Sequence, residues 1–142
     1  VDLYAGVGTF SIPLARAGAR VAAIELEGSA ARDLRRNCAK NGVDIDVVCD
    51  DAGRALPQVA RRLGRLDAIV VDPPRSGLDK RAISHIAQAS PQRIAYVSCD
   101  PQTMARDAAR LRERGWHLAS TTPVDLFPQT YHVETVNLFE RR

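Results

Sequence analysis

Cysteine is scarce in this sequence of 142 residues, and its placement excludes two common kinds of site. The three cysteines, Cys38, Cys49 and Cys99, form no CxxC pair and have no histidines interleaved at ligand spacing. An odd count without such pairs argues against both a disulfide framework and a zinc site. We therefore expect no metal, and each thiol needs its own explanation.

Long apolar runs are lacking as well. No stretch reaches the roughly 18 apolar residues that suggest a membrane helix, and no basic-then-apolar leader precedes the domain. We therefore expect a cytoplasmic protein that makes no membrane contact. The chain opens on Val-Asp-Leu-Tyr with no initiator Met, so we expect a fragment whose N-terminal part is missing. The formal net charge of +3 permits an anionic partner without proving one.

Short apolar runs alternate with helical patterns along the chain, without repeats or linkers. This rhythm is typical of βαβ units around a parallel sheet. We predict one domain over residues 1–142, an α/β fold with a seven-stranded, mostly parallel sheet and a C-terminal antiparallel hairpin. The expected strands are 1–4, 20–24, 45–49, 66–71, 93–98, 117–124 and 133–139.

Helical spacing between these runs identifies the helices that cover the sheet. Ala31, Leu34 and Cys38 fall on one helix face, and Cys38 and Cys49 are interpreted as buried structural residues. Pro57 suits the first turn of a short helix, where a missing amide costs little. Asp79 is expected to cap the helix that follows it.

A glycine turn follows the first strand. Gly6 and Gly8 precede a helical pattern, so backbone can approach a ligand closely at a helix N-terminus. Glu25 ends the next strand, where a carboxylate can accept both ribose hydroxyl protons, as in NAD and S-adenosylmethionine sites. Ser11 stands at the third glycine of the dinucleotide fingerprint, which weakens the NAD interpretation without excluding it.

Acidic residues follow the third and fourth strands. Asp51 could meet an adenine or merely cap the next helix, and the sequence leaves both interpretations open. Asp72 precedes two prolines and Arg75, and successive prolines force an extended, rigid backbone. Opposite charges are thereby fixed at the edge of the sheet where ligands bind in α/β folds.

Cys99 ends the fifth strand, directly before a helix that we expect to begin at Pro101. The helix dipole and its first amides favour the thiolate form, which is the reactive nucleophile. In the tail, Phe127, His132 and Glu134 belong to a polar and aromatic segment that a simple hairpin would not need. Alone, His132 and Glu134 could be outward residues of an edge strand.

Four stretches together resemble the RNA uracil-5-methyltransferase family, which includes the transfer-RNA and 23S ribosomal-RNA enzymes. They are Asp-Leu-Tyr-Ala-Gly-Val-Gly-Thr-Phe, Val-Asp-Pro-Pro-Arg-Ser-Gly, Tyr-Val-Ser-Cys-Asp-Pro-Gln-Thr-Met-Ala-Arg-Asp and Asp-Leu-Phe-Pro-Gln-Thr-Tyr-His-Val-Glu. The glycine turn is common to methyltransferases of this fold, whereas the last two blocks in this order are highly specific.

The resemblance implies a Rossmann-like S-adenosylmethionine-dependent methyltransferase fold and methylation of carbon 5 of a uridine in RNA. It makes Cys99 the nucleophile and Glu134 the general base, with Arg75 and His132 on the substrate side. The positions that match cofactor contacts of the family are Tyr4, Thr9, Glu25, Asp51 and Asp72. We add the glycines of the turn, Gly6 and Gly8, to the expected cofactor-binding residues. Of the two RNA classes we favour 23S ribosomal RNA over transfer RNA. The family's N-terminal RNA-binding barrel is absent here.

The chain departs from the family in two places, and several rival functions remain. Asp100 stands where the family commonly has Asn, beside the nucleophile, and Gln129 replaces a common His. An amino-methyltransferase would have an aromatic residue where Arg75 stands, and RNA cytosine-5-methyltransferases have a second cysteine in the proline motif. A nucleotide-binding dehydrogenase domain and an RNA-binding module without catalysis are the alternatives from other classes.

Overall fold

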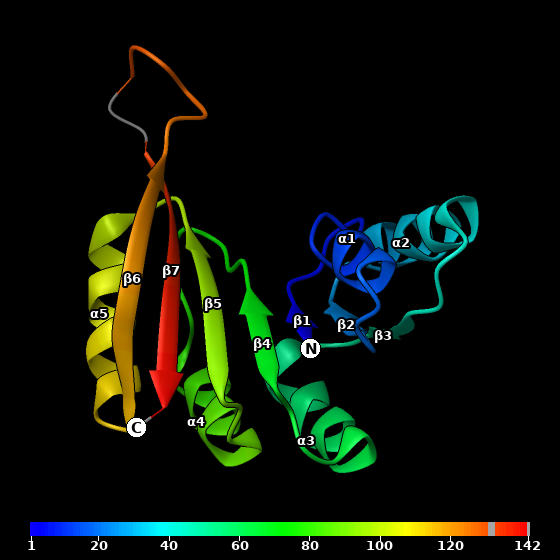
Figure 1. The fold of residues 1–142 in the computed structure, drawn as a ribbon, viewed down its shortest axis with the longest axis horizontal. Helices are drawn as coiled ribbons and strands as arrows, with labels where there is room; N and C mark the ends of the chain where they lie inside the picture. The colour runs from blue at the N-terminus through cyan, green and yellow to red at the C-terminus, as the bar shows by residue number, and fades with distance from the viewer. Residues whose placement is uncertain (131–132, 142) are drawn as a thin grey trace. The chain divides into compact units, whose positions relative to one another are not determined.

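The structure, a computed structural model, describes residues 1–130 and 133–141. Its strands are β1 (Asp2–Leu3), β2 (Ala22–Glu25), β3 (Asp46–Cys49), β4 (Ala68–Val71), β5 (Arg93–Ser98), β6 (Trp116–Val124) and β7 (Glu134–Arg141). Its helices are α1 (Ser11–Arg16), α2 (Gly28–Asn41), α3 (Ala52–Leu63), α4 (Lys80–Ala89) and α5 (Pro101–Arg112). Strands and helices alternate as predicted (Figure 1). None of these helices is long and apolar enough to cross a membrane.

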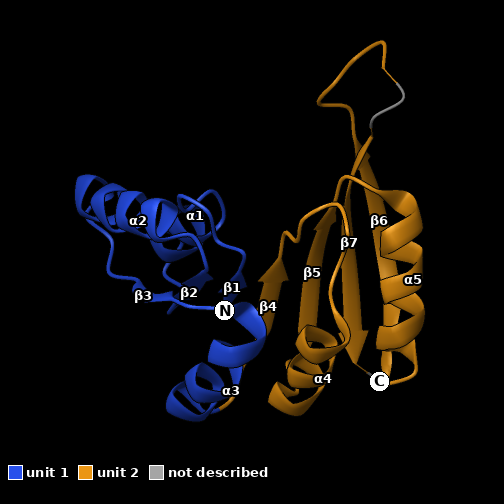
Figure 2. Cartoon of the chain, turned by 180° about the vertical axis from the view of Figure 1, so that it is seen from behind, with its two compact units in different colours: residues 1–64 blue, residues 65–142 orange. Residues whose placement is uncertain are grey.

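The chain divides into two compact units, residues 1–64 and residues 65–142 (Figure 2). In the first unit the strands follow the order β3-β2-β1, and both neighbouring pairs are parallel. In the second unit the order is β4-β5-β7-β6. There β4 and β5 are parallel, whereas β7 runs antiparallel to both β5 and β6. The predicted mostly parallel arrangement with a C-terminal antiparallel hairpin is confirmed.

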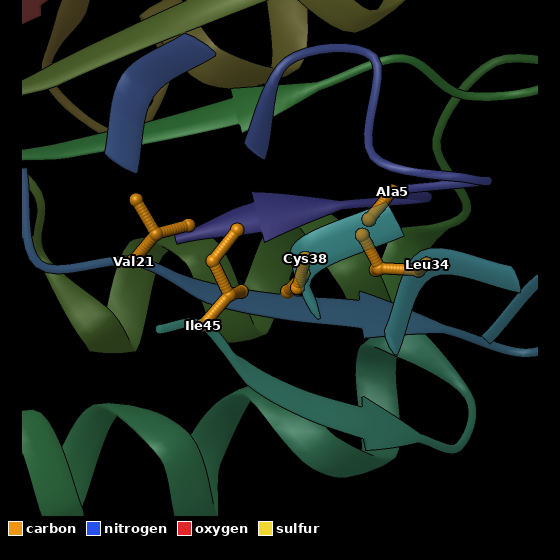
Figure 3. Packing of buried hydrophobic residues seen from close by; sticks show 6 residues of the cluster. Ala5, Val21, Leu34, Cys38 and Ile45 are labelled. Atoms are coloured by element: carbon orange, nitrogen blue, oxygen red, sulfur yellow. The ribbon is translucent and has the colours of Figure 1, made fainter. Parts of the chain in front are cut away.

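The core of the first unit forms between its strands and α2. The face of α2 that the sequence predicted is buried, with Ala31 and Leu34 fully removed from water and Cys38 nearly so. Figure 3 shows this apolar cluster, whose buried members are Ala5, Val21, Ala23, Leu34, Cys38 and Ile45. Burial of such side chains is the main favourable term that holds a helix against a sheet. Cys49 differs from the prediction, because it lies exposed at the end of β3.

The core of the second unit contains larger side chains. Trp116, Tyr96 and Phe139 are the largest fully buried residues, and they come from β6, β5 and β7. The indole of Trp116 donates to the Pro91 carbonyl (3.2 Å), so its polar atom is satisfied in the interior. The aromatic core of this unit therefore comes from strands β5, β6 and β7.

Helix α3 begins earlier than the sequence suggested. Asp51 caps it by accepting a hydrogen bond from the Arg54 amide (3.0 Å), which confirms its capping role. Pro57 therefore lies inside the helix, and its predicted place in the first turn was wrong. A proline at this position removes one hydrogen bond, the one that the Gly53 carbonyl would accept. The strong cap and the apolar face of the helix outweigh that loss.

Candidate active site

The glycine turn connects β1 to α1 in the first unit, and it depends on left-handed backbone. Tyr4, Gly6 and Gly8 have φ values of +62°, +54° and +101°. A Cβ at Gly8 would meet the side chains of Leu34 and Ile12, so glycine there lets the turn pack closely on its own helices. A Cβ at Gly6 would have nothing within 4 Å. The turn is thus tight at Gly8 and open at Gly6.

Glu25 lies at this turn, as the sequence predicted for the acidic residue after the second strand. One carboxylate oxygen accepts the Gly6 amide and the other accepts the Glu27 amide, both at 2.7 Å. Each oxygen has room for a further hydrogen bond, because a carboxylate offers about four acceptor sites. The backbone therefore orients an acceptor pair of the kind that can bind two neighbouring hydroxyl groups.

The other predicted cofactor positions of the first unit also follow the ends of its strands. Tyr4 follows β1 and is half-buried, and Thr9 is exposed within the turn. Asp51 follows β3, whose last residue is paired with Glu25 of β2. Capping uses one oxygen of Asp51 and does not test the predicted adenine contact. Tyr4, Thr9 and Asp51 thus lie at the carboxyl ends of parallel strands, where α/β sheets bind ligands.

In the second unit, the loop after β4 holds Asp72 and Arg75 at the surface. Partial burial raises the pKa of Asp72, and the negative charge of Glu134 raises it further. The two carboxylates are therefore close enough to repel each other. The loop closes in a turn in which the Gly77 amide donates to the Pro74 carbonyl (2.8 Å).

Cys99 lies between β5 and α5 and is partly exposed. The predicted start of the helix at Pro101 is confirmed, and Asp100 is its cap. One Asp100 oxygen accepts the amides of Gln102 and Thr103, each at 2.9 Å. The hydrogen bond from the Thr103 amide is the main reason why the pKa of Asp100 is lowered, and Gln102 and Arg75 add to it.

This cap changes the argument for the reactivity of the thiol. Pro101 has no amide hydrogen, and the next two amides of the helix bind Asp100. The sequence led us to expect that the first amides of the helix stabilise the thiolate directly. For the amides of Gln102 and Thr103 this expectation was wrong. The field of the helix dipole remains available, and Arg75 supplies a positive charge near Asp100.

The pairing of β5 with β7 brings Cys99 and Glu134 together. In this antiparallel pair Tyr96 faces Asn137 and Ser98 faces Thr135. Cys99 directly follows Ser98 in the chain, and Glu134 directly precedes Thr135, so both residues flank the last pair of this ladder. The backbone positions of the thiol and the carboxylate, which are distant in the sequence, therefore lie at the same end of one strand pair. The charge of Glu134 also acts on Asp72.

Two bracing residues carry no sequence signal that would have identified them. Asn37 of α2 donates to the carbonyl of Val7 (3.0 Å) and so braces the glycine turn. The Ser98 hydroxyl accepts the Asp100 amide (3.1 Å) and donates to the Asp100 carbonyl (2.9 Å), which fixes the backbone around Cys99. His132, predicted on the substrate side, lies outside the described residues.

Within residues 1–130 and 133–141, no group of three or more histidine, cysteine, aspartate or glutamate side chains could hold a metal ion. Cys38, Cys49 and Cys99 are all free thiols.

Comparisons with known proteins identify a family and a fold. The family described as tRNA (uracil-5-)-methyltransferase matches residues 1–142. Two relatives carry the name RNA methyltransferase. That of Lactiplantibacillus plantarum is 40% identical over 99% of the chain, and that of Streptococcus pyogenes serotype M18 is 43% identical over 97%. The chain spans 31% and 30% of the lengths of these relatives.

Solved structures extend the likeness to three dimensions. The tRNA (uracil-54, C5)-methyltransferase of Pyrococcus abyssi, determined with S-adenosyl-L-homocysteine, matches 97% of the chain with a TM-score of 0.84 and 35% identity. The chain covers 32% of that protein. Magnesium protoporphyrin IX methyltransferase of Synechocystis, at 20% identity and a TM-score of 0.74, shares the fold alone. The predicted Rossmann-like methyltransferase fold is confirmed.

Proposed function

Because the chain belongs to the tRNA (uracil-5-)-methyltransferase family, we propose that it transfers a methyl group from S-adenosylmethionine to carbon 5 of a uridine in RNA. We treat residues 1–142 as one catalytic domain of a longer enzyme. The observation that supports the proposal most is the register of β5 and β7, whose last pair, Ser98 and Thr135, is flanked by Cys99 and Glu134.

The residues of the glycine turn fit the cofactor. The open space at Gly6 leaves room for a ligand beside the backbone, and Glu25 presents oriented oxygens that suit the ribose hydroxyls. S-adenosylmethionine supplies a methyl group bonded to a positively charged sulfur. The residues that would hold it are Tyr4, Gly6, Gly8, Thr9, Glu25, Asp51 and Asp72.

The thiol of Cys99 starts the reaction. Carbon 5 of uracil is too poor a nucleophile to take a methyl group directly, so it must first gain electron density. The thiolate adds to carbon 6, a carbon–sulfur bond forms, and the electrons of the 5,6 double bond move toward the carbonyl at carbon 4. The resulting enolate makes carbon 5 nucleophilic. Carbon 5 would then take the methyl group as the bond from that group to the sulfonium sulfur breaks, which leaves S-adenosylhomocysteine.

Glu134 completes the exchange. After methylation carbon 5 carries both the methyl group and its original hydrogen, and the carboxylate removes that hydrogen as a proton. The electron pair left behind restores the 5,6 double bond and expels the thiolate of Cys99. One methyl group has been gained and one proton lost, which Glu134 passes to water.

The nearby carboxylate of Asp72 supports the role of Glu134 as a base. Two like charges that repel each other are relieved when one proton binds to the pair. The raised pKa of Asp72 records this repulsion together with partial burial. Asp72 thus places a second carboxylate near the proposed base.

Arg75 and His132 are our candidates for contacts with the RNA. The guanidinium of Arg75 is exposed beside the reacting edge, where it can bind a phosphate or the carbonyl of the base. The target base must leave the stack of the RNA to reach Cys99. We expect this reaction to take place in the cytoplasm.

We also propose which class of RNA is the substrate. The sequence motifs led us to expect 23S ribosomal RNA, whereas the family description and the protein from Pyrococcus abyssi name transfer RNA. Both RNAs can be transcribed without modifications and incubated with the intact protein and methyl-labelled S-adenosylmethionine. Labelled 5-methyluridine in 23S RNA supports our expectation, and label in transfer RNA alone would replace it with the alternative.

The same experiment tests the chemistry. We expect the label to appear as 5-methyluridine and to be lost with Cys99→Ala. Label in 5-methylcytidine or in an exocyclic amine would contradict the proposed reaction. RNA that is bound but never labelled would support a binding module without catalysis, and NAD bound in preference to S-adenosylhomocysteine would support a dehydrogenase domain.

A further inference from the structure

The carboxylate of Asp107 in α5 is fully buried, which is unusual for a charged group. One oxygen accepts the amide of Leu78 (2.6 Å) and the hydroxyl of Tyr96 (2.9 Å). The other accepts the guanidinium groups of Arg106 (3.0 Å) and Arg110 (3.2 Å). Four donors fill the acceptor sites of a carboxylate, so its burial is compensated.

The donors come from the segments that carry the proposed reacting groups. Tyr96 lies in β5, three residues before Cys99. Leu78 ends the loop that begins at Asp72, and Arg106 also donates to the carbonyl of Ser76 in that loop (2.7 Å). Asp107 itself belongs to the helix that starts directly after Cys99. A single side chain therefore joins the loop, the strand and the helix.

The contacts around Asp107 leave little freedom. Gly77 has a φ of +72°, and a Cβ there would clash with the carboxylate of Asp107 and the guanidinium of Arg106. Burial and the adjacent charge of Asp107 raise the pKa of Tyr96, so its hydroxyl stays protonated and remains a donor. The loop thus approaches α5 as closely as a backbone without a side chain permits.

Resting on the function proposed above, we propose that Asp107 is a positioning residue. It holds the loop of Asp72 and Arg75 in register with Cys99, so that the uracil is presented to the sulfur at the correct distance and angle. A buried ion pair is weak evidence for stability, because the desolvation of its charges offsets much of their attraction. Its value here lies in fixing one arrangement of three segments. The thiol and the base do not touch Asp107.

The test compares variants of the intact protein by turnover and by the rate at which RNA containing 5-fluorouracil becomes covalently attached. Asp107→Asn keeps the size of the side chain, but its amide group faces two donors in either orientation. We expect its kcat and its rate of attachment to fall by about 10- to 100-fold, since small misplacements of reacting groups have effects of that size. The KM for RNA and the affinity for S-adenosylhomocysteine should change by smaller factors than kcat, because the loop carries only Asp72 and Arg75 of the proposed contacts, whereas the alignment of the sulfur acts on the chemical step itself.

A milder variant and a control separate positioning from stability. Tyr96→Phe removes one donor and should lower kcat by a smaller factor, with little change in the melting temperature. Leu111→Ala, one turn further along α5, removes a buried apolar side chain and no hydrogen bond of the network. It should lower the melting temperature and leave the kcat of the folded protein near the wild-type value.

The outcomes distinguish this inference from the proposed function. If the wild type forms no attachment through Cys99, the proposed function fails. If the wild type forms it and both Asp107→Asn and Tyr96→Phe form it at the wild-type rate, the positioning role is overturned. If Asp107→Asn does not fold, Tyr96→Phe and Arg106→Lys decide, and wild-type rates in both would refute the role.

Discussion

The two units build the edges at which we propose that ligands bind in different ways. In residues 1–64 the edge is made by the backbone, with left-handed residues at the turn and a carboxylate, Glu25, held by two amides. In residues 65–142 the edge is made by side chains, with Asp107 and two arginines fixing the loop of Asp72 and Arg75. A backbone site tolerates changes of nearby side chains, whereas a side-chain network fails when one member is lost. The first suits a common cofactor and the second a particular reaction.

The largest expected effect is a loss of turnover on changing Glu134, the proposed general base. This change should affect the chemical step and leave cofactor binding intact. Glu134→Gln should lower turnover by about 10²- to 10⁴-fold, because an amide cannot take the proton from carbon 5. Attachment of RNA through Cys99 should still occur and should persist, since elimination needs that proton to leave. Turnover is measured by label transfer and attachment by denaturing gel.

The affinity of Glu134→Gln for S-adenosylhomocysteine should stay within about twofold of the wild-type value. The substitution keeps the size of the side chain and lies outside the proposed cofactor contacts. Turnover at the wild-type rate would remove Glu134 from the mechanism.

The next largest effect is expected in the first unit, where a change at Glu25 should weaken cofactor binding and leave the attachment of RNA intact. Glu25→Gln replaces one accepting oxygen with a donor, so the variant loses a charged hydrogen bond to a ribose hydroxyl and a backbone bond at the turn. We expect the affinity for S-adenosylhomocysteine to fall by about 10- to 100-fold, which matches ~1.5–3 kcal/mol for a hydrogen bond to a charged group. Titration calorimetry measures the change. Asp33→Asn on the exposed surface of α2 is the control and should bind as the wild type does.

At saturating cofactor, the attachment of RNA to Glu25→Gln should proceed at close to the wild-type rate. If this variant binds cofactor normally but fails to attach RNA, the result would contradict the proposal that Glu25 serves cofactor binding and not the reaction.

Gly6 in the first unit and Gly77 in the second allow the free energies of unfolding to be compared for the same substitution. Gly6→Ala places a methyl group in open space at a left-handed residue and should cost about 1–2 kcal/mol. Gly77→Ala meets the same backbone strain and also pushes into Asp107 and Arg106, so the cost should rise by a further ~1–3 kcal/mol. Urea unfolding of both variants gives the two free energies. Equal costs would mean that the contact between Gly77 and Asp107 is not tight.

The smallest effect is a dependence of stability on pH. The pKa of Asp72 lies above its ordinary value of 3.8 in the folded state, so the folded protein holds this proton to higher pH than the unfolded chain does. Stability therefore falls as pH rises through the window between the ordinary and the raised pKa. Asp72→Asn should melt at a slightly higher temperature than wild type at pH 7, and this gain should vanish by about pH 4, near the unperturbed pKa. A gain that is equal at both pH values would contradict the raised pKa of Asp72, which is caused first by burial and second by the charge of Glu134.

Local patterns predicted much of the fold, because caps and helix faces depend on neighbours in sequence. The buried face of Ala31, Leu34 and Cys38, the cap at Asp79 and the start of a helix at Pro101 are found where the sequence places them. Pro57 was misplaced because the cap at Asp51 determines where the helix begins and outweighs the preference of proline for a first turn. Cys49 was expected to be buried, but β3 ends at the surface.

The candidate site was predicted less completely, because its geometry depends on contacts between distant residues. Spacing alone could not pair Cys99 with Glu134, and only the family resemblance connected them before the strand register did. Asp107 ends one of the blocks that resemble the family, but the local pattern gives no sign that it is buried, since it looks like any charged residue of a surface helix. Its burial follows from donors at Leu78 and Tyr96, which lie 29 and 11 residues away.

The most direct test of the account is to locate the covalent bond. The intact protein is incubated with S-adenosylmethionine and RNA containing 5-fluorouridine, digested, and analysed by mass spectrometry. Because fluorine at carbon 5 cannot leave as a proton does, the adduct should remain on the peptide that contains Cys99. The exposed thiol of Cys49 should stay unmodified and serves as an internal control for simple accessibility. An adduct on any other residue, or an equal yield from Cys99→Ala, would contradict the central claim.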